Sequence, residues 1–349
     1  MIKKLLKPII IKTFSSNIAQ NILRGLSSGC KVLFYHGVEF EILNPIIQSL
    51  HLQFKFFEQH ITYLKNQYEI ISIDDLYDCI SNGYKIDPKH VILTFDDGYK
   101  NNHQVVFPFL DSMDIPFTVF ISTGHVESGD RFPTYILRVG FFNNYNTILN
   151  IPSLSTKFDI SNKNLQNSGY NYVVRIIKSA PQERVNAIIK DVKNSMTNEK
   201  WLEINNRYSS DEPMNWREVD ELHSSGISIG SHCHDHVLLH SNQSNKNINK
   251  QLNFSKSIIE KRYGRCSYFC YPNGTFRDIS PYAYNYIKNE YSLGFTTCTG
   301  EMSNTTNKYL LPRIGTPKDL EYFKFIMSSS FIRNRIYKKQ YHSFHNTIG

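Results

Sequence analysis

The chain has 349 residues, which is enough for one large domain or two ordinary ones with a full hydrophobic core. Its formal net charge of +8 is spread along the sequence without a long Lys/Arg block. This pattern disfavours a nucleic-acid-binding protein and favours an anionic partner, such as a nucleotide sugar, a diphosphate lipid or a membrane surface. The six cysteines include no Cys-x-x-Cys pair, and we expect reduced thiols.

The N-terminal segment, residues 1–29, begins with lysines and aliphatic residues. Lys7 and Pro8 interrupt its apolar run, which is then too short for the core of a signal peptide. No later stretch approaches the roughly 18 apolar residues of a membrane span. These features predict a cytoplasmic protein. Segment 1–29 is expected either to pack against the rest of the chain or, as a basic amphipathic element, to make peripheral contact with the inner face of an anionic membrane.

Strands and helices alternate in the first part of the chain. Apolar and β-branched runs predict strands at residues 30–38, 91–95 and 115–121, with a short strand near residue 71. Apolar positions at helical spacing predict helices at residues 54–67, 74–80 and 105–110. This alternation is typical of a parallel sheet whose faces are covered by helices.

Residues 127–214 interrupt the alternation. They contain an Asn/Tyr-rich part, a charged helical part and a polar link at residues 209–213. We interpret them as a helical insertion or lid beside the sheet. A small second domain is the alternative, although few sequence signals suggest a separate core.

The alternation resumes after residue 215. Helices are predicted at residues 216–223, 246–262 and 279–290, and strands at residues 227–231, 267–271 and 293–297, followed by an apolar segment at 309–314. Residues 316–349 are predicted to be a basic, aromatic tail.

Several predicted strands end in reactive residues. Asp96 and Asp97 follow one strand directly, and either form an Asp-Asp-Gly turn or half of a metal site. The carboxyl ends of parallel strands share one rim, so these residues can meet histidines from other strands. Two histidines and one carboxylate are a standard ligand set for a catalytic divalent metal, because they leave coordination positions open. The residues at strand ends are His36, Asp96, Asp97, His232, His236, the Pro272–Gly274 turn and Arg313.

Three motifs resemble those of the polysaccharide deacetylases, carbohydrate esterase family four. They are Thr-Phe-Asp-Asp-Gly at residues 94–98, Ser-His-x-x-x-His at residues 231–236 and Phe-Cys-Tyr-Pro-Asn-Gly at residues 269–274. The resemblance covers residues 30–315 and implies a catalytic domain of those bounds. It also implies an α/β fold, a distorted or incomplete (β/α) barrel with a helical insertion.

The resemblance also implies a metal centre. Asp97, His232 and His236 would bind a divalent ion, with zinc expected and Co²⁺, Ni²⁺ or Fe²⁺ as alternatives. Cys233 and His234 stand where the family has small polar residues, so His234 is a competing ligand.

Catalytic roles follow from the same resemblance. Asp96 would be the general base that accepts a proton from the attacking water. The backbone N–H of Asn273 would stabilise the oxyanion, and Arg313 would keep Asp96 ionised.

The general acid is assigned to His36. Many family members carry this histidine in a C-terminal Leu-x-x-His strand, but none follows Arg313, and His342 and His345 lie in the predicted tail. The Tyr-His-Gly-Val run at residues 35–38 is similar to that of a permuted subgroup, in which an N-terminal Tyr-His-x-Val strand supplies the acid. His36 is therefore expected to protonate the leaving amine.

The resemblance implies hydrolysis of the N-acetyl group of an amino sugar, with release of acetate. The substrate is expected to be a glycan or its lipid- or nucleotide-linked precursor in surface polysaccharide biosynthesis, with no nucleic acid partner. The alternatives are a non-catalytic carbohydrate-binding relative, a metal hydrolase that acts on another acyl group, and an iron oxygenase. The oxygenase alternative leaves the second aspartate unexplained.

Overall fold

The computed structural model describes residues 20, 22, 23, 25–27, 29–144 and 146–348. Most of the predicted segment 1–29 lies outside these residues. None of the helices in the described part of the chain is both long and apolar enough to cross a membrane.

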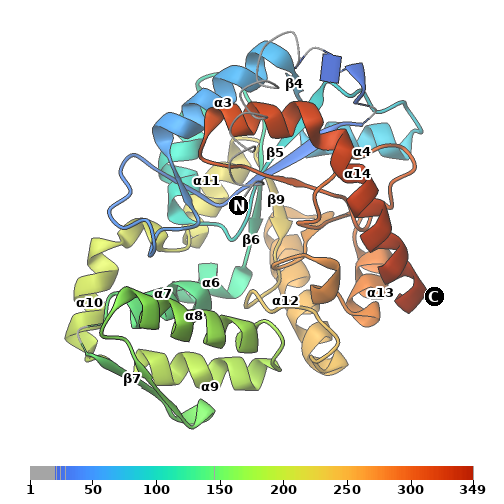
Figure 1. The fold of residues 1–349 in the computed structure, drawn as a ribbon. Helices are drawn as coiled ribbons and strands as arrows, with labels where there is room; N and C mark the ends of the chain where they lie inside the picture. The colour runs from blue at the N-terminus through green and yellow to red at the C-terminus, as the bar shows by residue number, and fades with distance from the viewer. Residues whose placement is uncertain (1–19, 21, 24, 28, 145, 349) are drawn as a thin grey trace, which may run out of the picture.

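A curled parallel sheet forms the centre of the molecule (Figure 1). Seven of its strands follow the order β11-β10-β9-β6-β5-β1-β12, and β4 pairs with β5 beside this path. The strands are β1 (Lys31–Tyr35), β4 (Glu69–Ile70), β5 (His90–Phe95), β6 (Thr118–Ile121), β9 (Ser228–Ser231), β10 (Tyr268–Cys270), β11 (Leu293–Phe295) and β12 (Ile314–Gly315).

The two ends of the sheet approach each other through one short segment. Leu311 forms a parallel bridge with Phe295 of β11, and Ile314 of β12 pairs with Leu33 of β1. The sheet is therefore an incomplete barrel whose seam is spanned by residues 311–315, and the predicted fold class is confirmed.

Helices cover the outside of the barrel. The helices that were predicted from the sequence begin and end within a few residues of the expected positions. They bury apolar residues on one side, and most have a side-chain cap at the N-terminus. Ser72 and Asp75, for example, form a reciprocal capping box at the start of α4. The helices are α3 (Phe54–Gln67), α4 (Ile73–Ser81), α5 (Phe107–Asp111), α11 (Trp216–Ser224), α12 (Asn245–Tyr263) and α13 (Pro281–Glu290).

The insertion between β6 and β9 forms a lobe beside the barrel, drawn mainly in green at the lower left of Figure 1. Its apolar residues form their own cluster, separate from the barrel core. This cluster includes Tyr135, Leu149, Val173 and Ile188. Few sequence signals pointed to this core, because its apolar residues alternate with polar ones along short elements. The elements are α6 (Thr123–Ser128), α7 (Pro133–Phe142), β7 (Ile148–Ile151), β8 (Thr156–Asp159), α8 (Lys163–Ile177), α9 (Gln182–Lys193) and α10 (Asn198–Arg207).

The region expected to be a basic tail is instead mostly one long helix, α14 (Leu320–Ile348). Phe323 and Met327 are fully buried, and Phe323 stacks on His60 of α3 with ring centroids 3.8 Å apart. Near the other end, Phe344 stacks on Phe276 at 5.3 Å. The basic composition hid this buried face, because the lysines and arginines occupy the remaining positions of the same helix.

The last residues of the insertion are attached to the loop after β5. The Met214 N–H donates to the Gly98 carbonyl at 2.9 Å, and the Lys100 N–H donates to the Glu212 carbonyl at 2.7 Å. Asp211, just before these two residues, is fully buried, and neither of its carboxylate oxygens has a hydrogen-bond partner among the described residues.

Replacing Asp211 with Asn should stabilise the protein more at about pH 8 than at about pH 5. Burial raises the pKa of Asp211 to about 7, although Arg138 and Arg131 act in the opposite direction. Above the unfolded pKa of about 3.9, folding must keep this carboxyl protonated or bury its charge, so its contribution to stability becomes less favourable as the pH rises toward 7. Urea unfolding at both pH values measures the effect.

The exposed residue Asp111 offers the matched control, since Asp111→Asn should change stability little at either pH. An equal effect of Asp211→Asn at the two pH values would contradict the shifted titration of this group.

Candidate metal centre and active site

The site lies at the carboxyl ends of β5, β9 and β10. The main-chain ladder continues past these strands: the Asp96 N–H donates to the Tyr35 carbonyl at 2.9 Å, and the His232 N–H donates to the Ile121 carbonyl at 2.9 Å. The backbone at Asp96 and His232 is therefore held by hydrogen bonds to neighbouring strands of the sheet.

Four residues at this rim have left-handed backbone conformations that non-glycine residues rarely adopt. They are Asp97 (φ 74°), Cys233 (φ 65°), His236 (φ 52°) and Asn273 (φ 57°). Such conformations cost about 1–3 kcal/mol each and persist where the surroundings enforce them, which is common at functional sites. Gly98 and Gly274 continue the turns with positive φ, and a Cβ at Gly98 would lie 2.9 Å from Ile121 Cγ2.

Asp97 faces two imidazole rings. Its Oδ1 lies 3.2 Å from His236 Nε2 and 3.4 Å from His232 Nε2. Asp97 and His232 are buried and His236 is half-buried. Burial raises the pKa of Asp97, but His236 and His232 outweigh it and hold that pKa well below the ordinary value.

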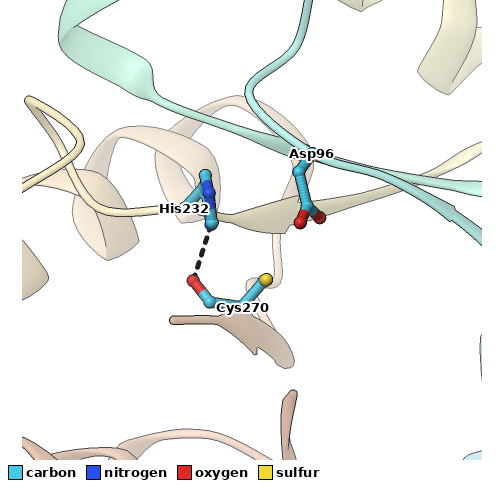
Figure 2. Close-up of side chains that lie close together, drawn as sticks. All are labelled: Asp96, His232 and Cys270. Atoms are coloured by element: carbon cyan, nitrogen blue, oxygen red, sulfur yellow. Dashed lines mark hydrogen bonds between the residues drawn. The ribbon is translucent and has the colours of Figure 1, made fainter. Parts of the chain in front are cut away.

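The tautomer of His232 follows from its environment (Figure 2). The Cys270 carbonyl lies 2.7 Å from His232 Nδ1 and can only accept, so Nδ1 carries the proton. In the neutral ring, Nε2 then carries the lone pair on the side that faces Asp97. Metal-binding histidines commonly have this arrangement, in which the second ring nitrogen donates to a carbonyl.

Asp96 is held by Arg313. Nη1 and Nη2 of Arg313 donate to the two carboxylate oxygens at 2.7 Å each, and the guanidinium also donates to the Thr296 carbonyl (2.9 Å) and Thr94 Oγ1 (3.0 Å). Arg313 is fully inaccessible to solvent. Burial raises the pKa of Asp96, but the charge and hydrogen bonds of Arg313 outweigh it and lower that pKa below its ordinary range.

Arg313 reaches Asp96 from a different position than the sequence suggested. It precedes β12 instead of ending a strand at the rim, since the next residue, Ile314, already pairs with Leu33 in β1. The side chain therefore enters from the barrel interior, where it packs over the Phe34 ring at 4.7 Å.

Among the described residues, two groups of possible metal ligands share His232. The first group, Asp96, His232 and Cys270, is drawn in Figure 2. Arg313 donates to both oxygens of Asp96 and to Cys270 Sγ at 2.9 Å, so its positive charge already lies beside this group. Burial raises the pKa of the Cys270 thiol well above its ordinary value, which disfavours the thiolate that a metal requires.

The second group, Asp97, His232 and His236, fits a divalent ion. Its three ligand atoms lie within 4.8 Å of one another. Asp97 Oδ1 is buried and lacks a hydrogen-bond partner among the described residues. A buried carboxylate oxygen without a donor is costly, and a cation would remove this cost.

The other histidines of this segment do not join that group. His234 Nδ1 lies 3.0 Å from Thr123 Oγ1, and the His234 ring packs edge-on against Phe254. His240 Nδ1 accepts a hydrogen bond from the Asn242 N–H. Four histidines in nine residues could not be told apart by spacing, but the turn at Cys233 directs only His232 and His236 toward Asp97.

His36 and Asn273 line the same cavity, which has a volume of ≈ 480 Å³ and also contains Asp96, Asp97 and both histidines. Burial lowers the pKa of His36, while the carboxylates of Asp97 and Asp96 act in the opposite direction. The Asn273 side chain is held by a hydrogen bond, in which its Nδ2 donates to Asp278 Oδ2 at 2.6 Å.

The outer wall of the cavity comes from the insertion. Tyr170, Val174 and Ile177 lie on one face of α8, and Val185 on α9 faces the same space. These wall residues were not predicted. Their helical spacing was visible in the sequence, but nothing local indicated that this face would oppose the metal ligands instead of packing inside the lobe.

The sequence of the chain places it in a known family. The sequence model of the polysaccharide deacetylase domain matches residues 83–292, well over half of the chain. The chain belongs to the polysaccharide deacetylase family. YxkH of Bacillus subtilis (strain 168), which carries the name of a polysaccharide deacetylase, is 31% identical over 98 residues. That match covers 27% of this chain and spans only 33% of the length of YxkH.

Two solved structures have a similar fold. The Streptococcus pyogenes deacetylase PplD in complex with acetate has a TM-score of 0.53 at 17% identity, over 83% of this chain and 93% of PplD. IcaB from Ammonifex degensii has a TM-score of 0.55 at 17% identity, over 86% of this chain and 97% of IcaB. At this identity the likeness shows the fold alone.

Proposed function

We propose that this polysaccharide deacetylase family member is a metal-dependent N-deacetylase of an amino sugar. The observation that carries the proposal concerns two adjacent carboxylates. Asp97 Oδ1 faces two imidazole nitrogens and lacks a donor among the described residues, and Asp96 is fixed beside it by Arg313. A binding protein would need neither the second carboxylate nor its buried arginine. A hydrolase needs both a metal site and a base.

Asp97, His232 and His236 would hold the ion, for which zinc is our proposal because two imidazoles and a carboxylate suit it. When bound, the ion supplies a Lewis acid that polarises the acetamide carbonyl and acidifies water.

Asp96 accepts the proton of the attacking water in this mechanism. Each carboxylate oxygen of Asp96 accepts one hydrogen bond from Arg313 and retains a further lone pair. Because the bidentate contact fixes the plane of the carboxylate, the base is oriented before substrate arrives. The cost is a lowered pKa, which keeps Asp96 ionised but makes it a weaker base.

Two further groups act on the substrate. We assign the Asn273 backbone N–H to the developing oxyanion, with the positive φ of Asn273 and its side-chain bond to Asp278 fixing the turn. We assign His36 to the leaving nitrogen, to which it would donate a proton. Burial lowers the pKa of His36, and the negative charges of Asp97 and Asp96 oppose this shift, toward the protonated form that the role requires.

The substrate would be an acetamido sugar within a glycan or on a lipid- or nucleotide-linked precursor. Acetate release from N-acetylglucosamine oligomers by the zinc-reconstituted protein tests the activity. Release that is lost on chelation and restored by zinc supports the proposal. Absence of release from every acetamido sugar and precursor offered would refute it, and release from O-acetyl groups alone would favour a different acyl substrate.

Replacing His36 with Ala should reduce turnover about a hundredfold or more while the metal content stays near normal. The reason is that His36 lines the cavity but does not belong to the group of possible metal ligands formed by Asp97, His232 and His236. Turnover and metal content are measured on the same preparation, and His125→Ala offers a control histidine that is absent from the lining of this cavity. Unchanged turnover of the His36 variant would show that another group protonates the amine.

A further inference from the structure

A groove beside the metal centre runs along α14. It consists of two cavities of ≈ 710 Å³ and ≈ 410 Å³. Thr297 lines both of them and also the metal-site cavity, and Arg333 lines both groove cavities. The three spaces therefore lie next to one another around Thr297, and the groove adjoins the cavity that contains Asp97.

Contacts of α14 fix which of its side chains face this groove. Asn334 Oδ1 accepts from the Glu301 N–H at 2.6 Å, and the Tyr337 hydroxyl donates to the Leu310 carbonyl at 2.7 Å. These bonds attach α14 to the segment between β11 and β12. Arg333 and Ile336 are left to line the groove.

The groove is cationic. Arg277, Arg333 and Lys318 line it, whereas no described Asp or Glu does. Within the described part of the chain, these three cations form no ion pair, unlike Arg313, which pairs with Asp96. The lining also includes threonines and aromatic residues, among them Thr275, Thr297, Thr299, Thr316, Phe276 and Phe344.

The acidic residues nearest in sequence are engaged elsewhere. Asp278 Oδ2 accepts hydrogen bonds from Asn273 Nδ2 and the Thr275 N–H. Glu301 is buried and pairs with Lys31 at 3.4 Å, and Asp319 accepts from the Tyr322 N–H at the start of α14. Their charges are therefore not directed at the groove cations.

We propose that this groove binds a phosphate-bearing part of the substrate, next to the acetamido sugar held at the metal centre. The proposal rests on the proposed deacetylase function and names its substrate class: an acetamido sugar that carries a phosphate ester or diphosphate. Unpaired arginines suit phosphate oxygens because they donate through two N–H groups at once. The aromatic and aliphatic lining can pack against a neighbouring sugar ring or the first units of a carrier lipid.

The test compares three substrates: a neutral N-acetylglucosamine oligomer, N-acetylglucosamine 1-phosphate and polyprenyl-diphosphate N-acetylglucosamine. Arg333→Gln should raise KM for the phosphorylated substrates about tenfold and leave the neutral oligomer unchanged. Arg335→Gln is the matched control, because it removes the same charge from an exposed position of α14 outside the groove lining. Preference for the lipid-linked substrate over the sugar phosphate identifies a lipid carrier, and equal use identifies the phosphate alone.

A binding measurement separates this inference from the proposed activity. Calorimetric titration of N-acetylglucosamine 1-phosphate into metal-free protein should give an affinity that falls about tenfold in Arg333→Gln and not in Arg335→Gln. If this holds without acetate release from any substrate, the groove is supported and the proposed function fails. If the neutral oligomer is deacetylated while Arg333→Gln changes neither KM nor affinity, the groove assignment is overturned and the function stands.

Discussion

Asp96→Asn should keep its metal, lose about a thousandfold in turnover and lose about 3 kcal/mol of stability at neutral pH. The metal is retained because Asp96 is not one of the three residues, Asp97, His232 and His236, that would hold the ion. The loss of turnover follows from removal of the proposed base. The loss of stability follows because the fully buried Arg313 keeps its charge and loses its only ion-pair partner within the described residues.

The stability difference should depend on pH in one direction. The folded pKa of Asp96 is lower than its ordinary value. The carboxylate therefore contributes stability above its unfolded pKa of about 3.9, and this contribution is lost as the pH falls through the folded pKa. Urea unfolding should show wild type and variant converging at low pH and diverging near neutrality.

The double variant Asp96→Asn, Arg313→Met provides the control for an unpaired charge. Removing both partners of a buried ion pair is less costly than removing one, so the double variant should regain part of the stability lost by Asp96→Asn, but none of the turnover. A single variant as stable as wild type at neutral pH would contradict the importance of this ion pair for folding.

Asp97→Ala should lose both metal and activity. Asp97 Oδ1 is the atom that both imidazole nitrogens face, so its removal leaves two ligands, too few for tight binding in the proposed site. A second readout avoids activity altogether. Zinc at about 1,000 times its Kd should stabilise the wild type by about 4 kcal/mol and should not stabilise the Asp97 variant detectably.

His234→Ala is the matched control for the metal site. It belongs to the same loop as the proposed ligands, but its Nδ1 faces Thr123 instead of Asp97. We expect near-normal zinc content and zinc-dependent stabilisation. If His234→Ala loses as much metal as Asp97→Ala, or if the Asp96 and Asp97 variants bind metal equally, the division of roles between these residues is wrong.

The sequence determined most of the local structure. Strands β5 and β6 were predictable because buried parallel strands are continuous apolar runs that end in turn residues, and α3 because its apolar residues recur at helical spacing. The motifs around Asp96, His232 and Asn273 identified the family because they combine strand ends with residues whose chemistry has few other uses. Asp-Asp-Gly and Pro-Asn-Gly also indicated turns, and the structure forms them with positive φ at Asp97 and Asn273.

Only the tertiary structure decided how these pieces meet. The lone pair of His232 depends on a carbonyl 38 residues away, and the state of Asp96 depends on an arginine 217 residues away that enters from the barrel interior. Such contacts are set by strand order and register, which local pattern does not encode. For the same reason the sequence could not show that α8 would form the cavity wall, or that α14 would bury an apolar face and leave Arg333 beside the site. A helix pattern specifies which residues share a face, but the packing partner decides which face is buried.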